Sequence, residues 1–232
     1  MPEIMVIVPA LNEERSIGKV LADIPRDIVS EVIVVNNNSS DGTAKVARNF
    51  GATVIRERRK GYGFACLKGI EYIASRSRKA DVVVFLDADY ADHPEEMTDL
   101  TRPIIQQDYD MVIGSRFLGK RETGAMPWHQ VLGNRLAISL INALYKVHYT
   151  DLGPFRAIKF DKLLNLKMKE KKYGWTAEMQ AKAAKQRLRY IEVPVTYRAR
   201  IGTSKISGTI QGTLCAGYGI VTTLLKNRWA HE

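Results

Sequence analysis

Residues 4–35 read IMVIVPALNEERSIGKVLADIPRDIVSEVIVV, and this stretch decides the fold class. The apolar runs at 4–9 and 31–35 predict two buried strands, and the polar and apolar residues between them predict a helix that Pro25 ends. Strands that alternate with helices in this way are typical of a mostly parallel sheet flanked by helices. We therefore expect an α/β fold.

The same alternation continues along the chain, which at 232 residues and without internal repeats fits a single domain. The predicted strands are 4–9, 31–35, 52–55, 81–86, 110–114, 155–159 and 190–193, and the predicted helices are 12–24, 41–50, 61–76, 94–107, 129–147 and 176–185. Residues 115–128 predict a loop that could become ordered when a ligand binds.

The composition indicates a soluble globular protein with a basic surface. The hydrophobic fraction is 45% and the charged fraction 26%, and Lys plus Arg exceed Asp plus Glu by 35 − 25 = 10. This charge attracts phosphates, nucleic acids or anionic lipid surfaces. No zinc-finger or RNP motif accompanies it, so we expect no nucleic-acid partner. The two cysteines suggest neither a disulfide framework nor a metal site, and no secretion signal opens the sequence, so we expect a cytoplasmic protein.

The C-terminal residues 208–232 predict an amphipathic helix or tail. The apolar stretch at 209–225 is interrupted by glycines, Gln211 and threonines, so it falls short of a membrane-spanning helix. It ends in a basic and aromatic edge that includes Lys226 and Trp229, which suits a membrane interface. The tail could therefore make peripheral contact with the inner face of a membrane, or it could pack back on the domain.

An acidic cluster stands directly after the predicted strand at 81–86. Its carboxylates are Asp87, Asp89 and Asp92. In open α/β sheets ligands bind at the carboxyl ends of strands, and crowded carboxylates repel one another unless a cation neutralises them. A hard divalent ion such as Mg²⁺ or Mn²⁺ takes oxygen ligands of this kind. The alternative is a solvated acidic turn that opens a helix.

Five segments together resemble family 2 of the glycosyltransferases, most closely its dolichyl-phosphate mannose or glucose synthase group, over about residues 3–207. They read VIVPALNEE at 6–14, VVNNNSSDGT at 34–43, FLDADYADHPEE at 85–96, GSR at 114–116 and DLGPFRAI at 151–158. The resemblance implies a single GT-A-type, Rossmann-like catalytic domain at 1–207. Within it we expect a nucleotide-sugar half at about 1–114 and an acceptor half at 115–207.

The resemblance also implies which residues bind the donor. The implied donor-binding residues are Pro9, Leu11, Asn12, Glu13, Asn36, Asn37, Lys60, Gly61, Asp87 and Ala88, and the implied metal ligands are Asp87, Asp89 and Asp92. The family usually has two aspartates where this sequence has Asn36 and Asn37. Because amides donate as well as accept hydrogen bonds, uridine and guanosine donors both stay open. The segment at 36–41 also suits a plain turn and helix cap.

Further residues are implied for the acceptor side. The implied phosphate-binding residues are Arg116, Arg135, Arg156, Arg200, Ser204 and Lys205, and the implied catalytic residues are Asp89, Arg116, Asp151 and Glu178. Asp151 could instead form a buried pair with Arg156 that holds its loop. Glu178 could be a general base or an ordinary carboxylate on a helix surface. The cations at 200–205 surround a glycine turn and suit a phosphate better than a neutral sugar.

These features predict inverting transfer of a hexose from a nucleoside diphosphate sugar, of the GDP-mannose or UDP-glucose type, to a polyprenyl or dolichyl phosphate. An acceptor phosphate is already an anionic nucleophile, so it needs cations to position it more than it needs a base. One alternative is a transferase of the same family acting on a hydroxyl acceptor, with Glu178 or Asp151 as the base. Another is a noncatalytic protein that binds nucleotides or nucleic acid.

Overall fold

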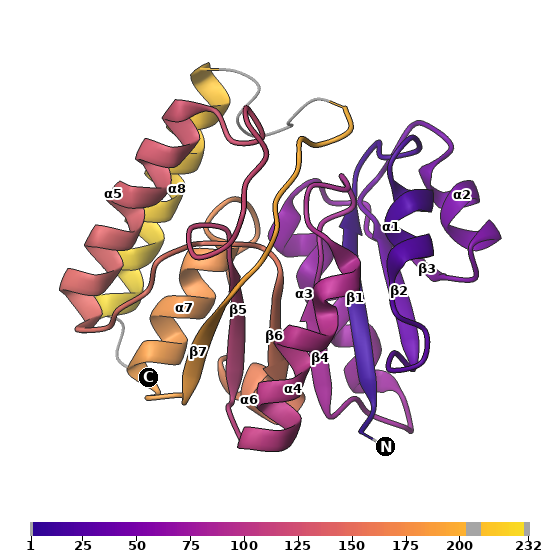
Figure 1. Ribbon diagram of the computed structural model, residues 1–232, viewed down its shortest axis with the longest axis horizontal. Helices are drawn as coiled ribbons and strands as arrows, with labels where there is room; N and C mark the ends of the chain where they lie inside the picture. Colours follow the sequence, from indigo (N-terminus) through magenta and orange to yellow (C-terminus); the bar gives the residue numbers. More distant parts are fainter. Residues whose placement is uncertain (1, 203–209, 230–232) are drawn as a thin grey trace.

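The computed structural model describes residues 2–202 and 210–229 (Figure 1). Within these residues seven strands form one sheet in the order β3-β2-β1-β4-β6-β5-β7. The strands are β1 (Ile4–Ala10), β2 (Glu31–Asn36), β3 (Thr53–Arg56), β4 (Val82–Phe85), β5 (Met111–Ser115), β6 (Arg156–Lys159) and β7 (Tyr190–Pro194). Only β6 runs antiparallel to its neighbours, which confirms the mostly parallel α/β sheet that the sequence predicts.

Helices cover both faces of the sheet, so the domain has three layers (Figure 1). One face packs against α1 (Ile17–Asp23), α2 (Thr43–Asn49) and α4 (Met97–Gln107), which follows the short 3-10 helix η1 (Pro94–Glu96). The other face packs against α3 (Tyr62–Ser75), α5 (Trp128–Tyr145), α6 (Phe160–Asn165) and α7 (Trp175–Lys185). The last helix, α8 (Ile210–Trp229), packs on α5 and α7.

The two cores follow from the alternation of side chains along each strand. In β1, Ile4, Val6 and Val8 point into one core, while Met5 and Ile7 point into the other. Every residue of β1 is buried, because helices cover both faces of the sheet. This double burial explains why the strands read as continuous apolar runs in the sequence.

The strand order places the candidate site. β2 and β3 lie on one side of β1, whereas β4 lies on its other side, so the direction of winding reverses between β1 and β4. Ligands in open α/β sheets bind at such a reversal, beyond the carboxyl ends of the strands. The loops after β1, β2 and β4 meet there, at the top of the molecule in Figure 1.

Two local features differ from the prediction. The first helix begins at Ile17, because residues 11–16 form turns in which Asn12 has a φ of +55°. The sequence also gave no signal for α6, which follows β6 directly. A helix does occupy much of the tail predicted at 208–232, and it packs on the domain. Among the described residues no helix has the length and apolar character needed to cross a membrane.

Candidate active site

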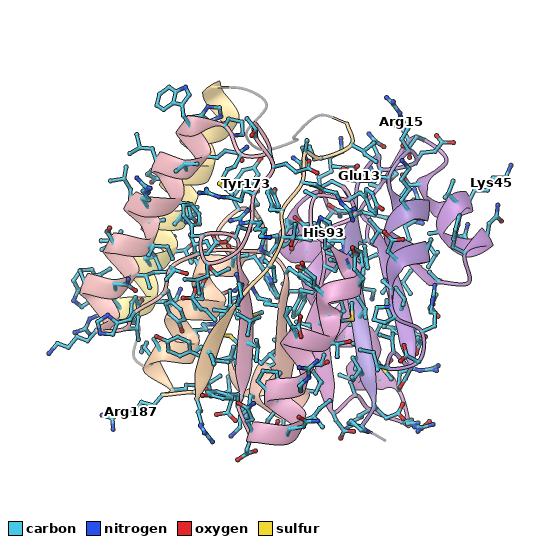
Figure 2. All side chains as sticks on the ribbon, viewed as in Figure 1. Glu13, Arg15, Lys45, His93, Tyr173 and Arg187 are labelled. Atoms are coloured by element: carbon cyan, nitrogen blue, oxygen red, sulfur yellow. The ribbon has the colours of Figure 1, made fainter. Side chains whose placement is uncertain are left out.

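A cavity of about 400 Å³ opens at the carboxyl edge of the sheet. Eight of the ten implied donor-binding residues line it: Pro9, Leu11, Glu13, Asn37, Lys60, Gly61, Asp87 and Ala88. Asp89 and Arg200 also line it, so residues far apart in the sequence meet at one site. Figure 2 shows Glu13 and Tyr173, two of the lining residues, on the upper side of the molecule, with Arg187 at the opposite end.

Asp87 lies in the cavity wall just past β4. Its Oδ1 accepts a hydrogen bond of 2.9 Å from the hydroxyl of Tyr62, the first residue of α3. Burial raises the pKa of Asp87 above its usual value. Burial, followed by the charge of Asp87, also raises the pKa of Tyr62, which keeps this hydroxyl a donor. The phenol of Tyr62 therefore orients Asp87, and a nearby cation would stabilise the charged form of Asp87.

Asp89 is paired with a cation from a distant segment. Its carboxylate forms an ion pair with the guanidinium of Arg200. The backbone supports this pairing, because the amide of Ile201 donates to the carbonyl of Asp89 at 2.9 Å and the amide of Arg198 donates to the carbonyl of Ala91 at 2.9 Å. The segment around Arg200 is thus held against the acidic loop by main-chain hydrogen bonds.

Arg198 adds further contacts between the segment around Arg200 and the acidic loop. Its guanidinium lies 3.4 Å from the ring centroid of Tyr90 and donates to the carbonyls of Tyr90, at 2.8 Å, and Asp92, at 3.2 Å. Tyr90 has a φ of +64°, a conformation that non-glycine residues seldom adopt, and its hydroxyl donates to Asp23 at 2.6 Å. These bonds hold the acidic loop in one shape.

Asp92 is placed differently from the other two aspartates. It is 2% exposed, it does not line the cavity, and neither of its carboxylate oxygens has a hydrogen-bond partner. Burial, with the nearby charge of Asp87, raises the pKa of Asp92 to about 8. The three implied metal ligands are therefore not gathered together, and the described part of the chain holds no cluster of three or more His, Cys, Asp or Glu side chains suited to a metal.

Two carboxylates do fit a metal that a ligand helps to hold. Asp87 and Asp89 both line the cavity, and Arg200 now neutralises Asp89. Mg²⁺ characteristically binds through one or two carboxylates together with the phosphates of a substrate. The site thus suits a divalent ion that arrives with a diphosphate, and does not resemble a cage built entirely from protein groups.

Asn36 and Asn37, at the end of β2, make different contacts. Asn37 is buried; its Nδ2 donates to the carbonyl of Arg59 at 2.6 Å, and its Oδ1 accepts from the amide of Gly61 at 2.9 Å. An ionised aspartate at this position could not donate to that carbonyl. Asn36 accepts from the amide of Ser39 at 2.9 Å, as in the turn that the sequence also allowed, and it does not line the cavity.

Asn12 also lies outside the cavity lining. Its Oδ1 accepts a hydrogen bond of 2.8 Å from the amide of Ser40, and its own amide donates to the hydroxyl of Ser39 at 3.0 Å. These bonds join the loop after β1 to the loop after β2. Asn12 therefore shapes the rim of the cavity through the backbone of its neighbours.

Arg116 and Asp151 form a buried ion pair with each other. Arg116 Nε donates to Asp151 Oδ2 at 2.8 Å and Nη2 donates to Oδ1 at 2.7 Å, while the Arg116 amide adds a third bond at 2.9 Å. The Asp151 side chain is fully buried and that of Arg116 is 12% exposed. Neither residue lines the cavity. This pair fixes the loop after β5 to the loop before β6.

Arg156 is not the partner of Asp151, so the pair allowed by the sequence is not formed. Its guanidinium donates to the carbonyls of Gly153 and, at 3.2 Å, Thr176. Arg156 is fully buried, and this burial lowers its pKa to about 10. In this arrangement the guanidinium holds a turn and does not face a ligand.

The carboxylate of Glu178 binds backbone amides of a neighbouring loop. It accepts hydrogen bonds from the amides of Lys169, at 3.0 Å, and Glu170, at 2.7 Å, and it forms an ion pair of 2.8 Å with Lys182. Glu178 is 3% exposed and lies outside the cavity lining, in contrast to the helix-surface position that the sequence also allowed. These bonds occupy both carboxylate oxygens.

The remaining implied acceptor-side residues differ in where they lie. Arg135 is exposed on α5, away from the cavity lining. Ser204 and Lys205 lie outside the described residues. Arg200 is thus the implied phosphate-binding residue that the structure brings into the cavity.

Five residues that line the cavity were not predicted from the sequence: Ala10, Tyr62, Ala65, Lys172 and Tyr173. Tyr62 directly follows Lys60 and Gly61, two of the implied donor-binding residues, so its place in the sequence was a signal. Lys172 and Tyr173 come from the stretch KEKKYGW at 169–175, which carries no motif. Their position depends on how the second half of the chain folds over the first.

The sheet order and the cavity at its carboxyl edge are those expected of a GT-A-type fold. Residues 5–166 match the model of glycosyl transferase family 2. The chain is 34% identical over 232 residues to the dolichyl-phosphate hexose transferase of Haloferax volcanii, which covers 97% of this chain and 96% of that one. It is 32% identical over 218 residues to an uncharacterised glycosyltransferase of Mycobacterium tuberculosis, covering 92% and 94% of the two chains.

A solved structure shows the same fold. It is the glucosyl-3-phosphoglycerate synthase from Mycobacterium tuberculosis in complex with Mn²⁺, uridine diphosphate and glucosyl-3-phosphoglycerate, with a TM-score of 0.76 and 22% identity over 100% of this chain and 81% of that one. The chain belongs to glycosyltransferase family 2. The resemblance to the dolichyl-phosphate sugar transferase group is likewise confirmed.

The buried Arg116–Asp151 pair predicts a large loss of stability in the variant Asp151→Asn. This change leaves the Arg116 guanidinium uncompensated, and we expect the free energy of unfolding to fall by about 3–5 kcal/mol. Asp99→Asn is the control, because Asp99 and Arg102 form an exposed pair of 3.4 Å whose loss should cost under about 1 kcal/mol. Urea unfolding measures both values, and equal losses would contradict the structural role of the pair.

Proposed function

We propose that this protein is an inverting hexosyltransferase that uses a nucleoside diphosphate sugar and a polyprenyl or related lipid phosphate, together with Mg²⁺ or Mn²⁺. The convergence of Asp87, Asp89 and Arg200 on one cavity supports the donor and metal assignments. The family relative named as a dolichyl-phosphate hexose transferase supports the acceptor. The solved structure with Mn²⁺ and uridine diphosphate supports the pairing of metal and diphosphate.

The observation that carries the acceptor proposal is the position of the carboxylates. Those lining the cavity are Glu13, Asp87 and Asp89, all from the donor half. The two candidate bases of the acceptor half, Asp151 and Glu178, are buried in other contacts. A hydroxyl acceptor needs a base to remove its proton, whereas a phosphate arrives as an anion. The site therefore suits an acceptor that needs no deprotonation.

The chemistry of the residues follows from their charges. Asp87 and Asp89 would hold the divalent ion, which when bound supplies positive charge to the leaving diphosphate. Arg200 neutralises Asp89 and lies where a phosphate oxygen would compete for its guanidinium. Because the acceptor is already an anion, the protein needs only to position it next to the sugar and does not need to supply a base.

We infer that the side chain of Asn37 does not read the base of the donor. The side chain of Asn37 is occupied by backbone groups at 59 and 61, so its amide is not available to read a base edge. Recognition then rests on the backbone around Pro9 and on Lys60 and Gly61. Donors of both the GDP-mannose and UDP-glucose types satisfy this proposal.

We further propose peripheral contact with an anionic membrane through α5 and α8. On α5 the side chains of Trp128, Leu132 and Leu136 recur every four residues and are 76%, 49% and 63% exposed. Arg135 is exposed beside them. On the neighbouring helix α8, Tyr218 and Trp229 are 74% and 68% exposed, and the last turn contains basic residues. Exposed aromatic, aliphatic and basic groups on paired helices suit the interface of an anionic bilayer.

Metal-dependent binding tests the donor site. We expect Mn²⁺ to strengthen the binding of UDP or GDP in titration calorimetry, and we expect Asp89→Asn to remove this dependence because it takes away a carboxylate ligand. Asp41→Asn is the control: Asp41 accepts a hydrogen bond of 3.0 Å from the amide of Thr43 and does not line the cavity, so the variant should keep the effect of the metal. Metal-dependent affinity that persists in Asp89→Asn would contradict the metal assignment.

Product formation tests the acceptor. Incubation of the protein with a panel of nucleotide hexoses, Mn²⁺ and a polyprenyl phosphate should yield a glycosyl phosphate lipid whose anomeric configuration is opposite to that of the donor. Transfer to hydroxyl acceptors with no lipid-phosphate product would overturn the proposal.

Flotation with liposomes tests the membrane surface. We expect the protein to co-float with vesicles that contain anionic lipid, and we expect Trp128→Ser combined with Leu136→Ser to lower the bound fraction several-fold. Ile105→Ser is the matched control, because Ile105 is an apolar residue 44% exposed on α4. An unchanged bound fraction in the double variant, or dimers held by this face in sedimentation, would contradict membrane contact.

A further inference from the structure

One segment of the acceptor half reaches into the donor cavity. Residues 169–173, which we call the strap, lie between α6 and α7 and bring Lys172 and Tyr173 to the cavity lining. Among the described residues of the second half, Arg200 is the other one that lines the cavity. The strap thus adds a second cation from the acceptor half to a cavity otherwise built by the donor half.

Two carboxylates hold the backbone of the strap. Glu178 accepts from the amides of Lys169 and Glu170 at 3.0 Å and 2.7 Å. The carboxylate of Glu170 accepts from the amides of Lys171 and Lys172 at 3.0 Å and 2.9 Å, and from the hydroxyl of Thr223 on α8 at 3.1 Å. Successive amides of the strap are therefore bound, and one anchor is the last helix.

The strap also packs closely against the start of α3. The amide of Phe64 donates to the carbonyl of Lys171 at 3.1 Å. Gly61 and Gly63 face the carbonyls of Lys171 and Glu170 so closely that a Cβ at either glycine would collide with them. The glycines of the stretch at 60–63 thus let the strap approach the donor half, which gives them a role beyond that of a simple loop.

The charge of Lys172 has no protein partner among the described residues. The described ion pairs of lysines involve Lys68, Lys159, Lys162 and Lys182. Lys172 is exposed at the cavity, whereas the amine of its neighbour Lys171 lies 5.7 Å from the ring centroid of Phe64 and does not line the cavity. A fixed backbone that carries an unpaired ammonium into a cavity suits an anionic ligand.

We propose that Lys172 binds the diphosphate of the donor and that the strap is a donor-positioning element supplied by the acceptor half. This inference rests on the proposed nucleoside diphosphate donor. Glu178 then acts as a positioning residue, because it holds the backbone that presents Lys172. The donor site is complete only when the second half of the domain is folded over the first.

Binding of UDP and GDP, compared with uridine and guanosine, tests the role of Lys172. In titration calorimetry with Mn²⁺ we expect Lys172→Ala to weaken diphosphate binding about tenfold or more, which is the loss typical of one charge-assisted hydrogen bond, and to leave nucleoside binding unchanged. Lys171→Ala is the control and should match the wild type. Equal diphosphate affinities for Lys172→Ala and the wild type would overturn the proposal.

A double-mutant cycle tests the role of Glu178. We expect Glu178→Gln to weaken diphosphate binding through Lys172, so that the variant carrying both changes is no weaker than Lys172→Ala alone. Additive losses would show that Glu178 acts independently of Lys172 and would overturn its positioning role. If the wild type binds neither UDP nor GDP, the proposed donor itself fails, which is distinct from failure of the Lys172 variant alone.

Discussion

The structure depends on the neutralisation of carboxylates that are crowded at the end of β4. Asp87 and Asp89 line the cavity, and Asp92 is buried without lining it. Burial raises the pKa of Asp87 and of Asp92, and the charge of Asp87 adds to the rise at Asp92. The cations that offset these charges come from distant segments, with Arg200 on Asp89 and Arg198 on the carbonyls of the same loop. The need to compensate this charge therefore ties the end of the chain to its first half.

A second constraint explains why the described residues of the acceptor half contribute cations and no carboxylate to the cavity. Its buried carboxylates are used to hold structure: Asp151 binds Arg116, and Glu178 binds successive amides of the strap. Buried charges are tolerated when they are paired and hydrogen-bonded in this way, and such groups are poor candidates for proton transfer to a substrate. The chemistry left to this half is the binding of anions, which agrees with a phosphate acceptor.

The sequence predicted most of the fold, because the inner strands β1, β4 and β5 are short apolar runs that are buried throughout. It also predicted much of the donor cavity, because the carboxyl ends of parallel strands converge and the motif residues follow those ends. It could not predict that Asp151 pairs with Arg116 rather than Arg156, since the choice depends on the antiparallel register of β5 and β6. The position of Lys172 is likewise set by tertiary packing, and its local sequence is an ordinary charged stretch.

The donor half and the acceptor half are consequently two parts of the sequence that contribute residues to the same cavity. The strap reaches the donor cavity from the second half, and Thr223 on α8 binds the carboxylate of Glu170, which holds the amide of Lys172. α8 is also the helix that packs on α5, whose exposed face carries Trp128 and Leu136. A short chain of direct contacts thus connects the surface proposed to meet the membrane with the cavity proposed to hold the donor. A shift of α8 at a bilayer would act on the strap through Glu170, because Thr223 of α8 donates directly to the Glu170 carboxylate.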